Sequence, residues 1–228
     1  MKTPVRVTLI GARGRMGQTI LNLAKNDPKI DIVEQCDLGD EIGPAIKNCD
    51  VAIDFSNASA IEEICRGASK HRAALVIGTT GHSPEQRQLI EKSAKSLPIV
   101  FASNFSVGVN TLFALTRRAA EILASEFKPK IVETHHKMKK DAPSGTAKTL
   151  GEILKEQLKI NVPIESIREG DVVGEHTVTF VGPSEQLELT HQAGDREIFA
   201  SGALRAAEWV AGKPAGLYSM QDVLGISK

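Results

Sequence analysis

A glycine-rich loop between a short apolar run and a helical segment constrains the fold more than any other feature of this sequence. Val5–Ile10 has the composition of a strand, and Gly11, Gly14 and Gly17 follow it where the helical pattern of Met16–Lys25 begins. Glycines in such a turn let the chain reverse tightly, let a pyrophosphate approach the backbone, and let helix and strand pack closely. The N–H groups and positive dipole at the helix N-terminus attract the anion. The loop predicts a dinucleotide site; the alternative is a glycine turn without a nucleotide.

An acidic residue after the second apolar run supports this prediction. Asp37 follows Gly17 by about 20 residues, where a carboxylate accepts hydrogen bonds from the adenosine ribose. Its charge would repel a 2′-phosphate and the next residue, Leu38, is not basic, so the pattern favours NADH or the use of both NADH and NADPH. Arg13 and Arg15 are either phosphate contacts or solvated surface charges.

Strand-like runs alternate with helical stretches before Ser106. The runs are Val5–Ile10, Ile30–Cys36, Val51–Phe55, Leu75–Ile77 and Ile99–Ala102, and the helical stretches are Met16–Lys25, Ala58–Lys70 and Pro84–Ser96. This alternation predicts βαβ units and a parallel sheet with helices on both faces. Two segments follow the carboxyl ends of strands, where open α/β sheets bind ligands. These segments, which are either cofactor contacts or ordinary turns, are Gly78, Thr79 and Thr80, and Ala102, Ser103, Asn104 and Phe105.

A different pattern begins near Asn104–Gly108, where we place a change of domain. The predicted helices are Val109–Phe127, Ser144 to about Lys159, and Ala203–Ala211; the predicted strands are Lys130–His136, Val172–Val181, Gln186–Gln192 and Glu197–Ser201. These strands predict a second sheet, mixed or antiparallel.

The composition argues against several classes of protein. The chain has 228 residues, of which 41% are hydrophobic and 25% charged, as in folded globular proteins. Lys+Arg and Asp+Glu are both 28, so no basic excess indicates nucleic-acid binding. No apolar run reaches the roughly 20 residues of a membrane helix. Cys36, Cys49 and Cys65 lack CxxC spacing and are expected to be buried free thiols. We therefore expect a cytoplasmic protein with no nucleic-acid or membrane partner.

The segment His135 to Lys140 is the most unusual in the chain, because two histidines and three lysines fall within six residues. Ser144 is a good N-cap, and Gly145 and Thr146 open the next helix. Cations beside a helix N-terminus favour a small, multiply charged anion such as a dicarboxylate. Histidine and lysine also transfer protons near neutral pH when their pKa values are tuned. The alternative is a solvated basic loop.

The spacing of the histidines predicts no metal site. The adjacent pair His135-His136 lacks HxH or HxxxH spacing and supporting cysteines. His176 and His191 fall in predicted strands, and we interpret them as structural.

Together the motifs resemble those of the 4-hydroxy-tetrahydrodipicolinate reductase family, also called dihydrodipicolinate reductases. The resembling motifs, in chain order, are G-A-R-G-R-M-G, D-F-S, G-T-T-G, S-N-F-S-V-G-V-N, E-T-H-H-K-M-K-K-D-A-P-S-G-T-A, G-E-H-T and F-A-S-G-A-L-R-A-A-E-W. They span nearly the full chain, and the basic-loop motif is the one specific to the family. The stretch between Asp37 and Val51 and the segment before Gly174 are shorter than in longer members.

The resemblance implies a fold, an assembly and a reaction. It implies an α/β fold with a Rossmann-like parallel-sheet cofactor domain, residues 1–105 and 200–228, and an α+β substrate and tetramerisation domain with a mixed sheet, residues 106–199. It implies a homotetramer that uses NADH, NADPH or both to reduce 4-hydroxy-tetrahydrodipicolinate to tetrahydrodipicolinate, with loss of water. This reaction belongs to the diaminopimelate route of lysine biosynthesis.

The resemblance also implies residue roles. His135 and Lys139 match the catalytic pair, and His136, Gly145 and Thr146 match substrate-binding positions. The positions that match cofactor contacts are Gly11, Ala12, Arg13, Gly14, Arg15, Met16, Asp37, Gly78, Thr79, Thr80, Ala102, Ser103, Asn104 and Phe105. In the implied mechanism hydride reaches C4 of a cyclic dicarboxylated imine, and Lys139 or His135 protonates C3.

Three alternatives remain open at this point: an amino-acid dehydrogenase, a redox-sensing regulator and a structural oligomer scaffold. An amino-acid dehydrogenase would share the first domain but would not need the basic loop. A redox-sensing regulator would bind the dinucleotide without turnover and would need a partner-binding element, which we do not find in the sequence.

Overall fold

The structure is a computed structural model that describes residues 3–37 and 39–226, so Leu38 lies outside the described residues. The chain forms two compact units. Unit 1 comprises the chain up to Phe105 and from Glu197 onward, and unit 2 runs from Ser106 to Arg196. Our division of the sequence placed residues 197–199 in the second domain, whereas in the structure they belong to unit 1.

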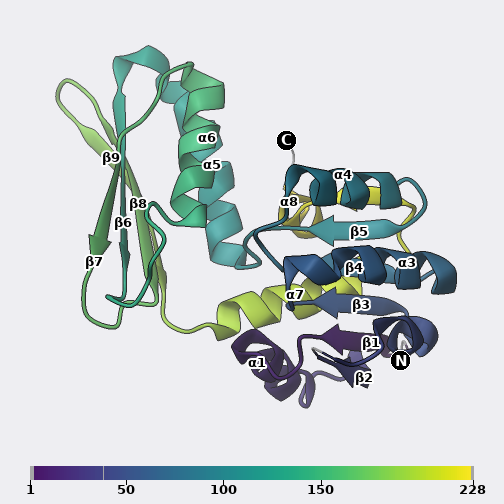
Figure 1. Ribbon diagram of the computed structural model, residues 1–228. Helices are drawn as coiled ribbons and strands as arrows, with labels where there is room; N and C mark the ends of the chain where they lie inside the picture. Colours follow the sequence, from purple (N-terminus) through teal and green to yellow (C-terminus); the bar gives the residue numbers. More distant parts are fainter. Residues whose placement is uncertain (1–2, 38, 227–228) are drawn as a thin grey trace. The chain divides into compact units, whose positions relative to one another are not determined.

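Unit 1 is built on a six-stranded parallel sheet in the order β10-β5-β4-β3-β1-β2 (Figure 1). Its strands are β1 (Val5–Ile10), β2 (Ile30–Cys36), β3 (Val51–Asp54), β4 (Ala74–Ile77), β5 (Pro98–Phe101) and β10 (Gly216–Tyr218). Its helices are α1 (Arg15–Ala24), α2 (Ile42–Ala45), α3 (Ile61–His71), α4 (Pro84–Ser93), α7 (Glu197–Val210) and α8 (Met220–Leu224), with 3₁₀ turns at Ile46–Asn48 and Ala58–Ala60.

The strands of unit 1 are apolar on both faces because helices cover both. In β3, Val51 and Ile53 pack in one core with residues of α1 and α7, whereas Ala52 packs in a second core with residues of α3 and α4. Alternate side chains of a strand point to opposite faces, which explains this division. The neighbours of β1 are β2 and β3, so the strand order reverses there and creates the crevice in which such sheets bind ligands. The predicted Rossmann-like sheet is confirmed.

Unit 2 contains a four-stranded mixed sheet in the order β7-β6-β8-β9. Its elements are α5 (Val107–Leu123), a 3₁₀ turn (Ala124–Glu126), β6 (Lys128–His135), α6 (Gly145–Leu158), β7 (Ile164–Arg168), β8 (Gly174–Val181) and β9 (Gln186–Ala193). Strand β6 pairs in parallel with β7 and antiparallel with β8. Ile131, Val178 and Phe180 of the sheet share a core with Leu112 of α5 and Leu150 of α6. The predicted mixed sheet is confirmed.

The prediction of a strand over Glu197–Ser201 is wrong, because these residues form the first turns of helix α7. Ala200, Ala203 and Ala207 recur at helical spacing and are fully buried. Gly202 lies so close to Phe105 that a Cβ at this position would overlap the Phe105 carbonyl oxygen. Tertiary packing therefore outweighs the β-like composition of Ile198 and Phe199. The short strands β7 and β10 were not predicted.

Within residues 3–37 and 39–226, no helix has the length and apolar character needed to cross a membrane.

Candidate active site

The glycine loop between β1 and α1 has the shape that a pyrophosphate requires. Gly11 has a positive φ of 85°, and a Cβ there would overlap the Phe55 carbonyl. A Cβ on Gly17 would overlap backbone carbonyls of Gly11 and Ala12. A Cβ on Gly14 would instead lie 3.3 Å from the Gly11 carbonyl oxygen, on an exposed position. Two glycines thus serve close packing, and the third leaves the α1 N-terminus open to a ligand.

Asp37 closes one side of this loop. Its carboxylate accepts a hydrogen bond of 2.6 Å from the backbone N–H of Arg13. The carboxylate therefore lies beside the glycine loop, where an acidic residue can bind ribose hydroxyls. Arg13 and Arg15 are exposed, Met16 is half-buried and Ala12 is buried.

The other predicted cofactor residues lie at the carboxyl ends of β4 and β5. Gly78 leaves room for the Phe55 ring, which lies 5.7 Å from the Phe105 ring, centroid to centroid. The Thr79 hydroxyl accepts a hydrogen bond of 2.9 Å from the Ser56 N–H. Residues 78–80 and 102–105 are thus connected through the D-F-S segment. The sequence analysis includes that motif but assigns no role to Asp54. The buried carboxylate of Asp54 also accepts a hydrogen bond from the Ser56 N–H, at 2.9 Å.

The basic loop of unit 2 starts where β6 ends and stops at the α6 N-cap. Backbone bonds hold its first residues: the His136 N–H donates to the Val172 carbonyl at 2.7 Å, and the Glu169 N–H donates to the His135 carbonyl at 3.0 Å. The Ser144 hydroxyl accepts from the first-turn N–H of Ala147 at 3.2 Å, which confirms the predicted N-cap.

The lysines of this loop differ in environment. The Lys139 ammonium forms an ion pair of 2.9 Å with Asp141 and is half-buried. Lys137 and Lys140 are exposed, and Met138 is 82% exposed. Because Lys139 is held in place and its neighbours are solvated, the structure separates it from the other cations of the run.

A fully buried carboxylate, Glu133, lies behind the basic loop. One of its oxygens accepts from the Nδ1 of His135, and both accept from the Arg168 guanidinium, at 2.8 and 3.0 Å. The Ser144 N–H also donates to Glu133, at 3.3 Å. Glu133 thus connects strand β6, strand β7 and the start of α6. Sequence reasoning missed Glu133 and Arg168, although residues 133 and 135 of a strand necessarily share a face.

These contacts set the charges in the cluster. Burial acts to raise the pKa of Glu133, but hydrogen bonds from Arg168 and His135 outweigh it and lower this pKa to about 2. Burial lowers the pKa of His135, and the nearby Lys139 and Arg168 add to this effect against the attraction of Glu133. Because Arg168 already compensates the charge of Glu133, burial prevails and the pKa of His135 lies below its usual value. The imidazole is then neutral at pH 7, with Nδ1 protonated toward Glu133 and Nε2 available to a ligand.

His176 belongs to the same cluster. Its ring contacts the His135 ring edge to face, with centroids 5.1 Å apart, and its Nε2 lies 3.0 Å from the Ser144 hydroxyl oxygen. Burial lowers the pKa of His176 to about 4. Gly174, two residues earlier, leaves room for His135, because a Cβ there would lie 3.0 Å from His135 Nε2. His191, on β9, instead contacts the N-cap of α5, with its Nε2 3.5 Å from the Ser106 hydroxyl oxygen.

Glu133, His135 and His176 each place one potential metal-ligand atom within 4.8 Å of the others. The carboxylate oxygens of Glu133 already accept hydrogen bonds from a guanidinium and an imidazole. A metal ion would have to displace the Arg168 cation, which the charge of a metal would repel. We therefore treat the cluster as a hydrogen-bonded network and assign no metal to it.

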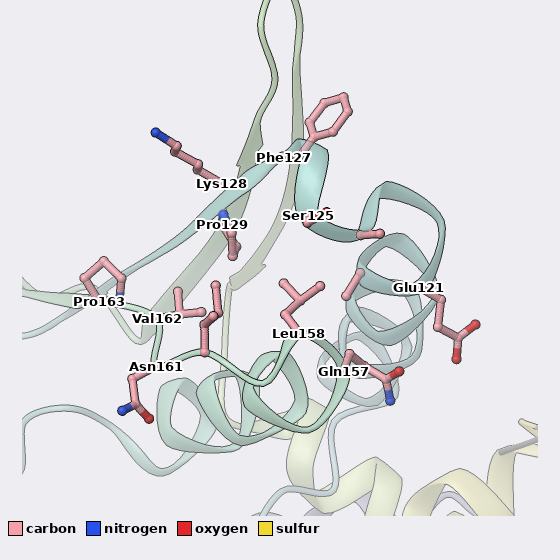
Figure 2. Close-up of a pocket in the computed structure, with 13 residues that line it drawn as sticks. Glu121, Ser125, Phe127, Lys128, Pro129, Gln157, Leu158, Asn161, Val162 and Pro163 are labelled. Carbon is pink, nitrogen blue, oxygen red and sulfur yellow. The ribbon is translucent and has the colours of Figure 1, made fainter.

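Unit 2 also has a pocket of about 480 Å³ at the other end of β6, shown in Figure 2. It lies between the C-terminal ends of α5 and α6 and the start of the sheet. Leu158 and Val162 line it, and its charged residues, Glu121 and Lys128, extend away from its centre (Figure 2). His135 ends the strand that Lys128 begins, about 23 Å away at the usual rise per residue. This pocket is therefore separate from the basic loop.

Comparison with known proteins decides the family. Residues 5–105 match the family description "Dihydrodipicolinate reductase, N-terminus", and residues 108–224 match "Dihydrodipicolinate reductase, C-terminus". The chain belongs to the dihydrodipicolinate reductase family. The 4-hydroxy-tetrahydrodipicolinate reductase of Akkermansia muciniphila is 46% identical over 98% of this chain and 99% of its own length. That of Geobacter metallireducens is 38% identical over 97% of this chain and 99% of its own.

A solved structure supports the fold. The dipicolinate-bound dihydrodipicolinate reductase from Paenisporosarcina sp. TG-14 has a TM-score of 0.81 and 23% identity, and covers 96% of this chain and 98% of its own. The amine dehydrogenase from Mycobacterium smegmatis has a TM-score of 0.60 and 12% identity, over 95% of each chain. Membership of the reductase family confirms the predicted family and enzyme class, and it favours a reductase over the amino-acid dehydrogenase and the sensor.

Proposed function

We propose that this chain catalyses the NAD(P)H-dependent reduction of 4-hydroxy-tetrahydrodipicolinate to tetrahydrodipicolinate, with loss of water, in the diaminopimelate route of lysine biosynthesis. The observation that carries the proposal is the arrangement of His135, Lys139 and the α6 N-terminus around one basic loop, in a chain that matches the reductase family over residues 5–105 and 108–224. Cations and helix N–H groups together suit a substrate with two carboxylates.

The glycine loop fits the cofactor, because Gly14 is the exposed N-cap of α1 and has no side chain to stand in front of the helix N-terminus, where a pyrophosphate binds. The residues that would hold NAD(P)H are Gly11, Ala12, Arg13, Gly14, Arg15, Met16, Asp37, Gly78, Thr79, Thr80, Ala102, Ser103, Asn104 and Phe105. When bound, the cofactor supplies the hydride. Asp37 binds ribose hydroxyls and disfavours a 2′-phosphate, so NADH is used at least as well as NADPH.

The residues of unit 2 bind the substrate and move a proton. His136, Lys139, Gly145 and Thr146 hold the carboxylates, and the positive charge of the loop lowers the energy of the bound dianion. The Lys139 ammonium delivers a proton to C3 of the ring, or His135 delivers it after its Nε2 has taken up a proton from solvent in the substrate complex. A positioned acid–base group contributes ~10²–10⁴-fold to the rate.

The test is a coupled assay in which an upstream synthase makes the unstable substrate from pyruvate and aspartate semialdehyde. NADH and NADPH consumption are followed in parallel by absorbance. We expect consumption that requires the synthase, and we expect His135→Gln and Lys139→Ala to lower kcat by ~10²-fold or more without weakening NADH binding. Lys140→Ala, which removes an exposed charge from the same loop, is the matched control. Near-wild-type turnover in both variants would overturn the assignment.

We also propose that the protein acts as a homotetramer in the cytoplasm, without a nucleic-acid or membrane partner. The sheet of unit 2 supports an assembly, because α5 and α6 pack on one face only among the described residues. On the other face lie the exposed side chains of Val181 and Thr190, and Thr190 is hydrogen-bonded to the half-buried Thr177. Light scattering of the purified protein tests the assembly, and a monomeric mass would contradict it.

A further inference from the structure

We propose that Glu133 and Arg168 are positioning residues for His135: Glu133 fixes the ring as the Nδ1–H tautomer, and Arg168 neutralises Glu133 so that the ring stays uncharged until it meets substrate. This inference rests on the proposed function, because it states which residues orient His135, one of the two catalytic residues of that function. Neither Glu133 nor Arg168 needs to touch the substrate.

The tautomer follows from the chemistry of the partners. An ionised carboxylate only accepts hydrogen bonds, so the His135 nitrogen that contacts Glu133 must carry a proton. In a neutral imidazole the other nitrogen, Nε2, then has the lone pair. Glu133 lies two residues before His135 on β6, so both side chains point to the same face of the sheet. The strand itself thus fixes the distance between them.

Arg168 determines how Glu133 acts on the ring. A lone buried carboxylate would attract a second proton to the imidazole and hold it as a cation. Arg168 instead binds Glu133 with two parallel N–H bonds, a geometry that only a guanidinium provides. The net charge behind the ring is then close to zero.

The groups around His135 come from every element that packs against it. Glu133 lies on β6, Arg168 on β7, Lys139 on the basic loop and His176 on β8. Apart from Glu133, the charged members are cations, and His176 is neutral at pH 7 because burial lowers its pKa to about 4. This arrangement agrees with the lowered pKa of His135.

The same pair also fixes the loop that carries Lys139. Arg168 donates to the Asp141 carbonyl at 2.7 Å, and Glu133 accepts from the Ser144 N–H. Asp141 in turn holds the Lys139 ammonium. One buried ion pair therefore orients both members of the catalytic pair, which explains why a costly buried charge is present here.

The test measures the His135 ring directly by ¹⁵N NMR of the full chain, with His135→Gln used to assign its signals. In the native chain we expect Nδ1 protonated and Nε2 unprotonated near pH 7. Arg168→Met leaves the charge of Glu133 uncompensated and should raise the pKa of His135. Glu133→Gln removes that charge and should either lower the pKa of His135 further or allow the proton to occupy Nδ1 or Nε2. Arg168→Lys keeps the charge and should leave the pKa near the native one.

Kinetics provide a second readout. Glu133→Gln should lower kcat/KM by ~10²-fold and shift its pH profile, with NADH affinity unchanged. Glu156→Gln, an exposed residue of α6 whose carboxylate forms an ion pair of 3.5 Å with Arg117, is the matched control. An Nε2–H tautomer in the native chain, or pKa shifts of the same sign in Arg168→Met and Glu133→Gln, would overturn the proposal. These NMR results need no turnover, so a native chain without synthase-dependent activity would refute the proposed function separately.

Discussion

Replacing glycines of the β1–α1 loop one at a time should separate folding from cofactor binding. Gly17 lies against backbone carbonyls of Gly11 and Ala12, which cannot rotate away from an added methyl group. Overpacking of this kind costs up to ~3 kcal/mol, and the better helix propensity of alanine offsets ~1 kcal/mol. Gly17→Ala should therefore lose ~2 kcal/mol of unfolding free energy, or ~4–8 °C in Tm for a chain of this size.

Gly14→Ala should behave in the opposite way. Gly14 has a φ of −68°, which alanine adopts without strain, and its nearest Cβ contact is 3.3 Å. Stability should change by less than ~1 kcal/mol. The methyl group would nevertheless occupy the approach to the α1 N-terminus, and loss of one charge-assisted hydrogen bond, ~1.5–3 kcal/mol, weakens NADH binding by ~10- to 100-fold.

Both variants are measured by thermal unfolding and by fluorescence titration with NADH. Wild-type Tm in Gly17→Ala would refute the packing argument. Wild-type NADH affinity in Gly14→Ala would refute the placement of the pyrophosphate. A variant that lost both properties together would show that the two roles are not separable.

Three further outcomes are expected. Asp37→Asn removes the charge near the ribose but keeps an oxygen for the Arg13 N–H, so the KM for NADPH should fall relative to that for NADH in steady-state assays. Ser144→Ala removes the α6 cap and should cost ~1 kcal/mol in denaturant unfolding, with no change if the cap is unimportant. Acid should destabilise the fold in two steps, because His176 and Glu133 both have lower pKa values in the folded chain than in the unfolded chain, so protons bind the unfolded chain more readily. The contribution of His176 to stability is lost between pH 6.5 and about 4, and that of Glu133 between pH 4.5 and about 2. A flat stability profile from pH 7 to 4 would contradict the first step.

The glycine loop and the basic loop could be predicted because each is a local feature. The roles of Gly11 and Gly17 depend on backbone shape within a few residues, and Ser144 caps the helix that starts beside it. The strand–helix alternation likewise predicted the parallel sheet, since each buried strand is a short apolar run between helices.

The partners of His135 could not be predicted in the same way. Arg168 reaches Glu133 only because β7 pairs with β6 in a particular register, and β7 is too short and too polar to stand out in the sequence. His176 comes from β8, on the other side of β6, where it pairs with Glu133. Strand pairing is a long-range property, so local patterns give the members of the cluster without showing that they meet.

The order of the two units along the chain has a consequence for how the protein folds during translation. Unit 2 is one continuous segment, whereas unit 1 needs α7, β10 and α8, which follow unit 2 in the chain. Ala203 and Ala207 of α7 fill the core of unit 1, so this core stays incomplete until α7 has left the ribosome. Domains usually fold in the order of their synthesis. Here the first part of unit 1 is translated first but cannot complete its fold. Unit 2, which is inserted in unit 1, is the first unit that can reach its native structure during translation.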